Sequence, residues 1–389
     1  MTNRQNAHGS FSRRRFLQST AAGAALAATP GLARRAAAGD NGVIRIMGVE
    51  TAALADWSPF EAQTGLKVEF EGIGSDPGLF RQQVIANEIG DRIDIILIDG
   101  GTEDDLGAKG YFAPLSGDGV PSWQGVPDEI LKSPLAVGPD GTQYGLPVVM
   151  NADSFAYYPE EIGESEPLSF ALLFESDKTK GRVALENTWL TTFPMAGMYM
   201  NASGRSNIAD VSDPSPEEAK AIADFLIERK KAGQFRTMWS TWEESIDLLA
   251  SKEVIVVNCW EPAVLEVRKK GHDVRYASTI EGYNKWMICA YVPTQALERS
   301  SPEIAKALEG FLGGAYAAKI AVLRGYATAN AAAGLDWAKT NGMSAEEQAA
   351  IEANIAKIDK KFQAEQFWQN AAPTHAQVVE AEFERFRLA

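Results

Sequence analysis

The chain is poor in the residues that metal sites, disulfide frameworks and most catalytic sites use. Its 389 residues include two cysteines and three histidines, which excludes a zinc framework and a disulfide-dense scaffold. The GxSxG, P-loop and HExxH motifs of common enzyme classes do not occur in it. We therefore expect no catalytic residues, no bound metal and no cofactor.

The sequence also lacks long hydrophobic runs and, beyond its first 38 residues, any basic block. No window there approaches the roughly 18 consecutive apolar residues that a membrane-spanning helix needs. Acidic residues outnumber basic ones by 52 to 37, which gives a formal net charge of −15. Nucleic-acid-binding proteins usually present a basic face, so we expect neither a nucleic-acid partner nor a membrane span.

Residues 1–38 have the layout of an export signal. They contain six arginines and no acidic residue. The arginines at 13–15 precede Phe16 and Leu17, a short apolar stretch over residues 19–32, and three alanines at 36–38. A charged region, an apolar region and a small-residue cleavage site in this order indicate a signal peptide, and paired arginines indicate the bacterial twin-arginine pathway. We predict a twin-arginine signal peptide over residues 1–38 and a periplasmic protein; a disordered basic tail is the alternative.

The remainder of the chain is strongly acidic. Without the six arginines, 31 basic residues remain against 52 acidic ones, a formal net charge of −21. Such a protein repels anions at long range, which favours cationic or neutral ligands. An acidic surface also serves solubility alone.

After the signal, strand and helix patterns alternate. Residues 43–49, 66–71 and 93–98 are typical of buried strands, and residues 52–63 and 78–88 between them are typical of helices. This order predicts an open α/β sheet with right-handed crossovers. Ligands of such sheets bind beyond the carboxyl ends of the strands, where Glu50 and Asp99 stand.

The later segments predict a second lobe. Helical patterns cover residues 215–231 and 242–251, strand patterns cover 254–257 and 273–276, and the chain is almost all helix from residue 302. Long strands near residues 148–158 and 286–292 are expected to cross between the lobes. The prediction is lobe 1 over residues 41–150 and 291–345, lobe 2 over residues 151–290, and C-terminal helices over residues 346–389 that pack on the lobes.

Aromatic residues gather near the predicted strand ends of the second lobe. Trp260, Tyr283 and Trp286 are there, and Tyr326 follows a glycine further on. Aromatic faces in a cleft stack on ligands or hold cations, and the same residues in a core serve packing.

The two cysteines allow two states. Cys259 and Cys289 both fall at predicted strand ends. In an oxidising periplasm they pair if their Cα atoms come within about 7 Å; otherwise they remain buried thiols.

A set of short motifs resembles one protein family. They stand at residues 257–260 (Val-Asn-Cys-Trp), 281–287 (Glu-Gly-Tyr-Asn-Lys-Trp-Met), 292–293, 301–305, 325–326 and 330. In this order they resemble the periplasmic spermidine/putrescine-binding proteins of bacterial ABC importers. Residues 60–68 and 144–148 resemble the broader solute-binding superfamily, and residues 367–370 resemble a late family motif that contributes a glutamine.

The resemblance implies a fold and a set of partners. The fold is the two-lobed periplasmic-binding-protein type II fold, in which each lobe is a mixed sheet flanked by helices and the lobes close on a solute by hinge motion. The implied partners are a small solute and an inner-membrane ABC permease, and we expect a monomer. Residue by residue, the resemblance places Trp260, Trp286, Tyr326 and Gln369 in the cleft. Our full set of candidate ligand-binding residues is Glu50, Asp99, Asn187, Thr188, Trp260, Tyr283, Trp286, Tyr326 and Gln369.

The chain departs from the family pattern where the ligand's charge is met. The family has an aspartate two residues after Trp286, where this chain has Ile288. The acids expected within residues 186–191 fall on Thr188 and Thr191, and the aromatic residue expected at the end of the first strand falls on Gly48. A buried ammonium group needs a carboxylate partner. Candidates from other walls of the cleft are Glu50, Asp99, Asp153 and Glu186.

These observations leave three functions open. The first is an exported receptor of an ABC importer for a polyamine or related amine. The second is the same class of receptor for an amino-acid-like, carboxylate or phosphonate solute, which helix N-termini after the strand ends would suit. The third and least favoured is an exported hydrolase that uses paired carboxyl groups from Glu50, Asp99 and Glu186.

Overall fold

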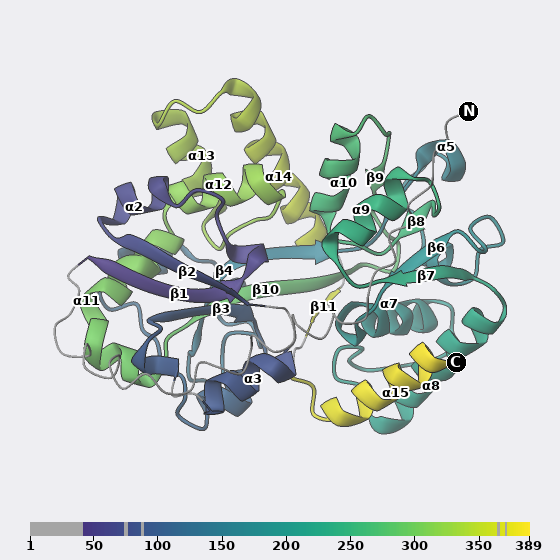
Figure 1. Cartoon of the computed structure of the whole chain (residues 1–389), viewed down its shortest axis with the longest axis horizontal. Helices are drawn as coiled ribbons and strands as arrows, with labels where there is room; N and C mark the ends of the chain where they lie inside the picture. Colours follow the sequence, from purple (N-terminus) through teal and green to yellow (C-terminus); the bar gives the residue numbers. More distant parts are fainter. Residues whose placement is uncertain (1–41, 74–76, 87–88, 364–365, 370–371) are drawn as a thin grey trace, which may run out of the picture. The chain divides into compact units, whose positions relative to one another are not determined.

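The computed structural model describes residues 42–73, 77–86, 89–363, 366–369 and 372–389. The predicted signal peptide lies outside these residues. The described residues belong to one compact unit that contains two mixed β-sheets with helices around them (Figure 1). No described helix combines the length and the apolar character required to cross a bilayer.

The first sheet contains the three strands that the sequence predicts at the start of the fold. Its strands are in the order β11-β10-β3-β1-β2, and β4 also pairs with β10. β1 runs parallel to β2 and β3, whereas β10 runs antiparallel to β3 and β4. The strand bounds are β1 Val43–Val49, β2 Lys67–Ile73, β3 Ile95–Asp99, β4 Gly145–Asp153, β10 Tyr283–Tyr291 and β11 Gln366–Trp368.

Helices and short turns surround this sheet. α11 packs against α2 and β1, and its apolar residues Ile304, Leu308 and Phe311 are buried in the main core. The bounds are η1 Glu50–Ala52, α2 Ser58–Thr64, α3 Pro77–Ala86, η2 Ile89–Asp91, η3 Glu103–Gly107, η4 Pro121–Gly125, α4 Asp128–Leu131 and α11 Thr294–Phe311.

The second sheet has the order β7-β6-β8-β5-β9 and its own buried core. Its helices begin at clear sequence signals: α8 starts with a capping box in which Ser215 and Glu218 satisfy each other's backbone N–H groups. The bounds are β5 Ala156–Tyr157, α5 Pro159–Ile162, α6 Ala171–Phe174, β6 Val183–Glu186, α7 Trp189–Ala202, α8 Pro216–Lys231, β7 Phe235–Trp239, α9 Trp242–Ala250, β8 Val256–Val257, α10 Glu261–Lys269 and β9 Arg275–Tyr276.

β4 and β10 form the link between the sheets. Their antiparallel register runs from Tyr291↔Gly145 to Asn284↔Asp153, and the chain after β4 enters the second sheet as β5. Residues 283–290, which the sequence analysis assigns to the second lobe, pair with β3, β4 and β11 of the first sheet.

The C-terminal helices divide between the two sheets. α12, α13 and α14 pack together around Ala318, Ala338 and Ile351, and α14 reaches β4. α15, yellow in Figure 1, instead packs on α8 and α7 beside the second sheet. The bounds are α12 Gly314–Arg324, α13 Ala331–Thr340, α14 Ala345–Gln363 and α15 Ala376–Leu388.

The end of β1 explains one departure from the resembling family. Gly48 pairs with Leu97 of β3, and a Cβ atom at position 48 would lie 2.7 Å from the Leu97 Cβ and 2.9 Å from its carbonyl oxygen. The aromatic residue that the family has at this position therefore has no space in this chain.

This close approach predicts a stability effect. Gly48→Ala should lower the free energy of unfolding by about 1–3 kcal/mol because the added methyl group overlaps Leu97, and urea unfolding measures it. The matched control is Gly72→Ala, at the position that pairs with Gly48 across β1 and β2. There the nearest atom to an added Cβ is the Glu50 Oε1, at 3.2 Å, so stability should stay within about 0.5 kcal/mol of wild type. Equal stability of the two variants would contradict the steric argument.

Candidate functional site

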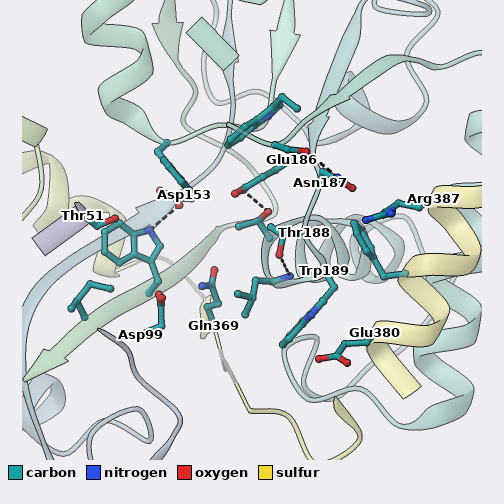
Figure 2. A pocket seen from close by; sticks show the side chains of 18 of the residues that line it. Thr51, Asp99, Asp153, Glu186, Asn187, Thr188, Trp189, Gln369, Glu380 and Arg387 are labelled. Atoms are coloured by element: carbon teal, nitrogen blue, oxygen red, sulfur yellow. Dashed lines mark hydrogen bonds between the residues drawn. The ribbon is translucent and has the colours of Figure 1, made fainter. Parts of the chain in front are cut away.

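A cavity of about 840 Å³ lies at the ends of strands from both sheets. Asp99, Asp153, Glu186 and Trp239 line it, and they are the last residues of β3, β4, β6 and β7. β7 is only partly buried before Trp239, whereas β3, β4 and β6 are buried strands that stop at the cavity. This is the position at which open α/β sheets bind ligands. Figure 2 shows the labelled side chains around the cavity, with Asp99 and Asp153 on the side of the first sheet.

Asp99 lies next to Ile288, its cross-strand partner in β10. Both residues line the cavity. Burial raises the pKa of the Asp99 carboxyl group to about 6. Because directly opposed residues of an antiparallel pair share one face of the sheet, this carboxyl group lies beside the position where the resembling family has its aspartate.

Asp153 is held by two side-chain N–H donors. The Trp286 Nε1 donates to its Oδ2 at 2.8 Å, and the Asn151 Nδ2 donates to its Oδ1 at 3.4 Å. The Tyr276 hydroxyl oxygen lies 3.3 Å from the same Oδ1 and donates its hydrogen to the Cys259 carbonyl oxygen at 2.8 Å. Burial raises the pKa of Asp153 to about 7, although the charge of Lys361 acts in the opposite direction.

Glu186 faces the cavity from the second sheet. The Thr191 hydroxyl donates to its Oε2 at 2.7 Å, and its backbone N–H donates to the Asn258 Oδ1 at 2.6 Å. Burial, with a smaller contribution from the charges of Asp153 and Asp99, raises the pKa of Glu186 to about 8. The three carboxyl groups therefore influence one another electrostatically.

Aromatic rings form the remaining walls in two groups. Trp260 stacks on Trp242 with centroids 6.0 Å apart and meets the Trp239 ring edge to face at 5.6 Å. Trp286 meets Tyr326 edge to face at 5.0 Å. These contacts fix the ring orientations, so the cavity presents preformed aromatic faces beside its carboxyl groups.

The structure brings most of the predicted site residues together. Those that line the cavity are Asp99, Asn187, Thr188, Trp260, Trp286, Tyr326 and Gln369. The Gln369 Oε1 accepts a hydrogen bond of 2.7 Å from the Asn284 Nδ2, which orients its amide.

Glu50 and Tyr283 are not among the described residues that line the cavity. The Glu50 side chain is 78% exposed and lies 3.9 Å from the Arg324 Nη2, because the chain turns into η1 directly after β1; its neighbour Thr51 lines the cavity instead. Tyr283 precedes Trp286 by three residues in β10, so its side chain lies on the opposite face of the strand. Its ring is 5.5 Å from the Lys361 Nζ.

Several lining residues were outside the predicted set. Asp153 and Glu186 are among the acids that the sequence offers as partners of an ammonium group, and Ile288 is a departure from the family pattern. Trp239 ends β7, a strand that the sequence patterns do not predict. No sequence signal indicates that α15 lies beside the cavity, because only its packing on α7 and α8 brings it there. The residues that α15 contributes are Glu380, Phe383, Glu384 and Arg387.

The cysteines and possible metal ligands were also located. Cys259 and Cys289 are free, buried thiols. In the part of the chain that the structure describes, no group of three or more histidine, cysteine or acidic side chains is placed to hold a metal ion.

Comparisons with known proteins relate this geometry to a family. A family model described as bacterial extracellular solute-binding protein matches residues 57–345. A comparison with curated proteins finds no match. A solved structure of a putative spermidine/putrescine ABC transporter from Listeria monocytogenes has a TM-score of 0.65 at 14% identity, over 89% of this chain and 99% of that one.

Two further solved structures share the fold. MotA from A. tumefaciens B6, in complex with glucopine, has a TM-score of 0.63 at 19% identity, over 88% of this chain and 99% of that one. AgtB from A. tumefaciens R10, in complex with agropinic acid, has a TM-score of 0.63 at 15% identity, over 90% and 99%. These likenesses confirm the predicted two-lobed, mixed-sheet fold. Since the family model matches most of the chain, the protein belongs to the bacterial extracellular solute-binding proteins.

Proposed function

We propose that this protein is an exported receptor that binds a small cationic solute, a polyamine or related amine, and presents it to an inner-membrane ABC permease. The observation that carries the proposal is the set of carboxyl groups of Asp99, Asp153 and Glu186 in one cavity. Among the described lining residues the one base is Arg387, and its Nη1 lies 3.2 Å from the Glu384 Oε1.

An amine would supply the charge that this cavity lacks. Burial is the main cause of the raised pKa values of the three carboxyl groups. For Asp153 the charge of Lys361 offsets only part of this effect. A bound ammonium group restores the ionised form of a carboxyl group and forms charge-assisted hydrogen bonds with it. The faces of Trp260, Trp286 and Tyr326 add cation–π attraction of about 0.5–2 kcal/mol each where they meet the cation.

The rest of the chain supports the transport role. The arginine pair in residues 1–38 supports export by the twin-arginine pathway to the periplasm. Two sheets joined by β4 and β10 suit a receptor whose lobes close over its ligand. The likeness to a putative spermidine/putrescine transporter supports both the amine and the permease partner. We expect the receptor to act as a monomer and without chemical turnover.

One observation favours a second ligand class, an amine that also carries a carboxylate. The N-terminal turn of the 14-residue helix α7 borders the cavity through Thr188, Leu190 and Thr191. Helix N-termini attract anionic groups. The likeness to proteins solved with glucopine and agropinic acid adds to this candidate.

A ligand screen tests the proposal. Residues 39–389 should be stabilised by putrescine, spermidine or, for the second class, γ-aminobutyrate, and not by neutral sugars or dicarboxylates. A ligand at 100 times its Kd adds about 2.7 kcal/mol to the free energy of unfolding, which thermal-shift measurements detect. Recovery of unchanged ligand after long incubation separates the receptor from a hydrolase. Stabilisation by dicarboxylates alone would refute the amine proposal.

The carboxyl group of Asp99 should contribute directly to amine binding. Asp99→Asn keeps the shape of the side chain and removes its charge, so the affinity for the amine should fall by roughly tenfold to a hundredfold. Isothermal titration calorimetry measures this loss. Glu50→Gln is the matched control, because it removes an exposed acid just outside the cavity and should leave the affinity unchanged. Equal losses of amine affinity in the two variants would show that long-range electrostatics causes the effect and that Asp99 does not contact the amine directly.

Amine affinity should rise with pH between about 5 and 8. Asp99, Asp153 and Glu186 have pKa values raised to about 6, 7 and 8, so at low pH the amine must displace protons from them. The folded protein without ligand holds these protons more tightly than the unfolded chain does, so its stability should fall over the same range. Calorimetry in two buffers of different ionisation enthalpy should show proton release on binding. An affinity independent of pH would contradict this account.

A further inference from the structure

A buried cluster of charges joins α14 to α10. The Lys357 Nζ lies 2.8 Å from the Glu261 Oε1, and the Lys361 Nζ lies 3.4 Å from the Glu261 Oε2. The Glu261 side chain is 13% exposed and the Lys361 side chain 7%. Burial alone would raise the pKa of Glu261, but the two lysines bring it below its ordinary value. Glu261 is therefore ionised, and two lysines against one glutamate leave the cluster with a net charge of +1. None of the three residues is among the described residues that line the cavity.

Each member of the cluster is linked to a residue that lies directly beside a cavity-lining residue in the sequence. Two members bond to the backbone of such a residue, and the third is such a residue itself. The Lys361 Nζ donates to the carbonyl oxygen of Ala152 at 2.9 Å, directly before Asp153. The Lys357 Nζ donates to the carbonyl oxygen of Gly325 at 3.1 Å, directly before Tyr326. Glu261 directly follows Trp260, the N-cap residue of α10.

Asn354 adds a contact of the same kind. Its Nδ2 donates to the carbonyl oxygen of Tyr326 at 2.7 Å, and the residue is buried. Asn354, Lys357 and Lys361 are spaced by three and four residues in α14, which places them on one face of the helix. A single helix face thus holds two segments of the cavity wall directly and a third, at Trp260, through Glu261.

Tyr276 provides a further link between Lys361 and Asp153. The Lys361 Nζ lies 4.7 Å from the centroid of the Tyr276 ring. The hydroxyl group of Tyr276 donates to the carbonyl oxygen of Cys259 at 2.8 Å and is 3.3 Å from the Asp153 Oδ1. Loss of the Lys361 ammonium group would therefore remove one backbone contact directly before Asp153 and one contact with the Tyr276 ring beside its carboxyl group.

We propose that Lys361, Glu261, Lys357 and Asn354 are positioning residues of the ligand site. They set ligand affinity by holding Asp153, Trp260 and Tyr326 in place from the side that faces away from the cavity. The proposal rests on the proposed function, since ligand affinity is the property that these residues set. None of them is among the described residues that line the cavity. The proposed contribution is geometric, since site residues must keep their productive positions to within about 0.5 Å, and it is distinct from the effect of the Lys361 charge, which lowers the pKa of Asp153.

The test compares this cluster with a matched one elsewhere in the protein. Lys361→Met removes one lysine and leaves Glu261 paired with Lys357. The control is Arg229→Met: the Arg229 Nη1 lies 2.7 Å from the Glu175 Oε1, and Glu175 keeps Arg205 at 2.8 Å. The Arg229 and Glu175 side chains are also mostly buried, 20% and 16% exposed, and neither lines the cavity.

Binding of putrescine, spermidine and γ-aminobutyrate is measured for each variant well below its unfolding temperature. Lys361→Met should weaken binding roughly tenfold or more, and Arg229→Met should leave it within about twofold of wild type, even if both variants lose stability. Wild-type affinity in Lys361→Met would overturn the proposal.

Hydrogen exchange separates this proposal from the proposed function. In the absence of ligand, Lys361→Met should speed exchange at residues 150–153, 258–261 and 325–327, and Arg229→Met should not. Exchange unchanged at these segments would overturn the positioning role whatever the protein binds. Failure of the wild type to bind any of the three probes would instead refute the amine function, and the exchange data would still decide the positioning role.

Discussion

The pairing of β4 with β10 is the constraint on which the rest of the site depends. Its register puts Trp286 and Asp153 on the same face, where the indole N–H donates to the carboxylate. Slipping the pairing by one residue would turn Trp286 and Ile288 away from the cavity. Because β4 also leads directly into β5 of the second sheet, the ladder that builds one wall of the cavity also connects the two sheets. A receptor that closes about this connection would keep that wall intact while the opposite wall moves.

Asp99 places a carboxyl group beside Ile288, the position at which the resembling family has its aspartate. The resembling family has its acid two residues after the tryptophan of β10, and this chain has Ile288 there. The neighbouring strand β3 ends in Asp99 at the matching register position, on the same face of the sheet. The charge of the wall is thereby preserved, but its carboxyl group lies one strand further from β4. A shift of this kind changes the spacing between carboxyl groups, which is the quantity that distinguishes one amine from another.

Sequence patterns predicted the parts of this molecule that local chemistry determines. The strands β1 and β3 follow from their apolar runs, Asp99 follows from the rule that ligands bind at strand ends, and Trp260 and Trp286 follow from the family resemblance. Tyr283 was not separated from Trp286 because the predicted strand begins only at residue 286. β10 begins at Tyr283, and a spacing of three residues within one strand places the two side chains on opposite faces. The contribution of α15 and the membership of β10 in the first sheet depend on tertiary pairing between segments far apart in the chain. The cluster around Glu261 was missed for the same reason, since α10 and α14 are separated by about ninety residues in the sequence.

Asp153 lies between two kinds of buried acidic group. One kind is paired with lysines of the protein, and the other has a pKa that burial raises. On the side of α14, Glu261 pairs with Lys357 and Lys361, which lower its pKa and keep it ionised. On the cavity side, burial is the main cause of the raised pKa values of Asp99 and Glu186, so protons bind these carboxyl groups readily. A proton neutralises a buried carboxyl group at little structural cost, whereas a lysine would occupy the cavity itself. Protons are thus the natural competitors of a cationic ligand here. The lysines that the fold does bury are placed where they secure the wall and leave its inner face acidic.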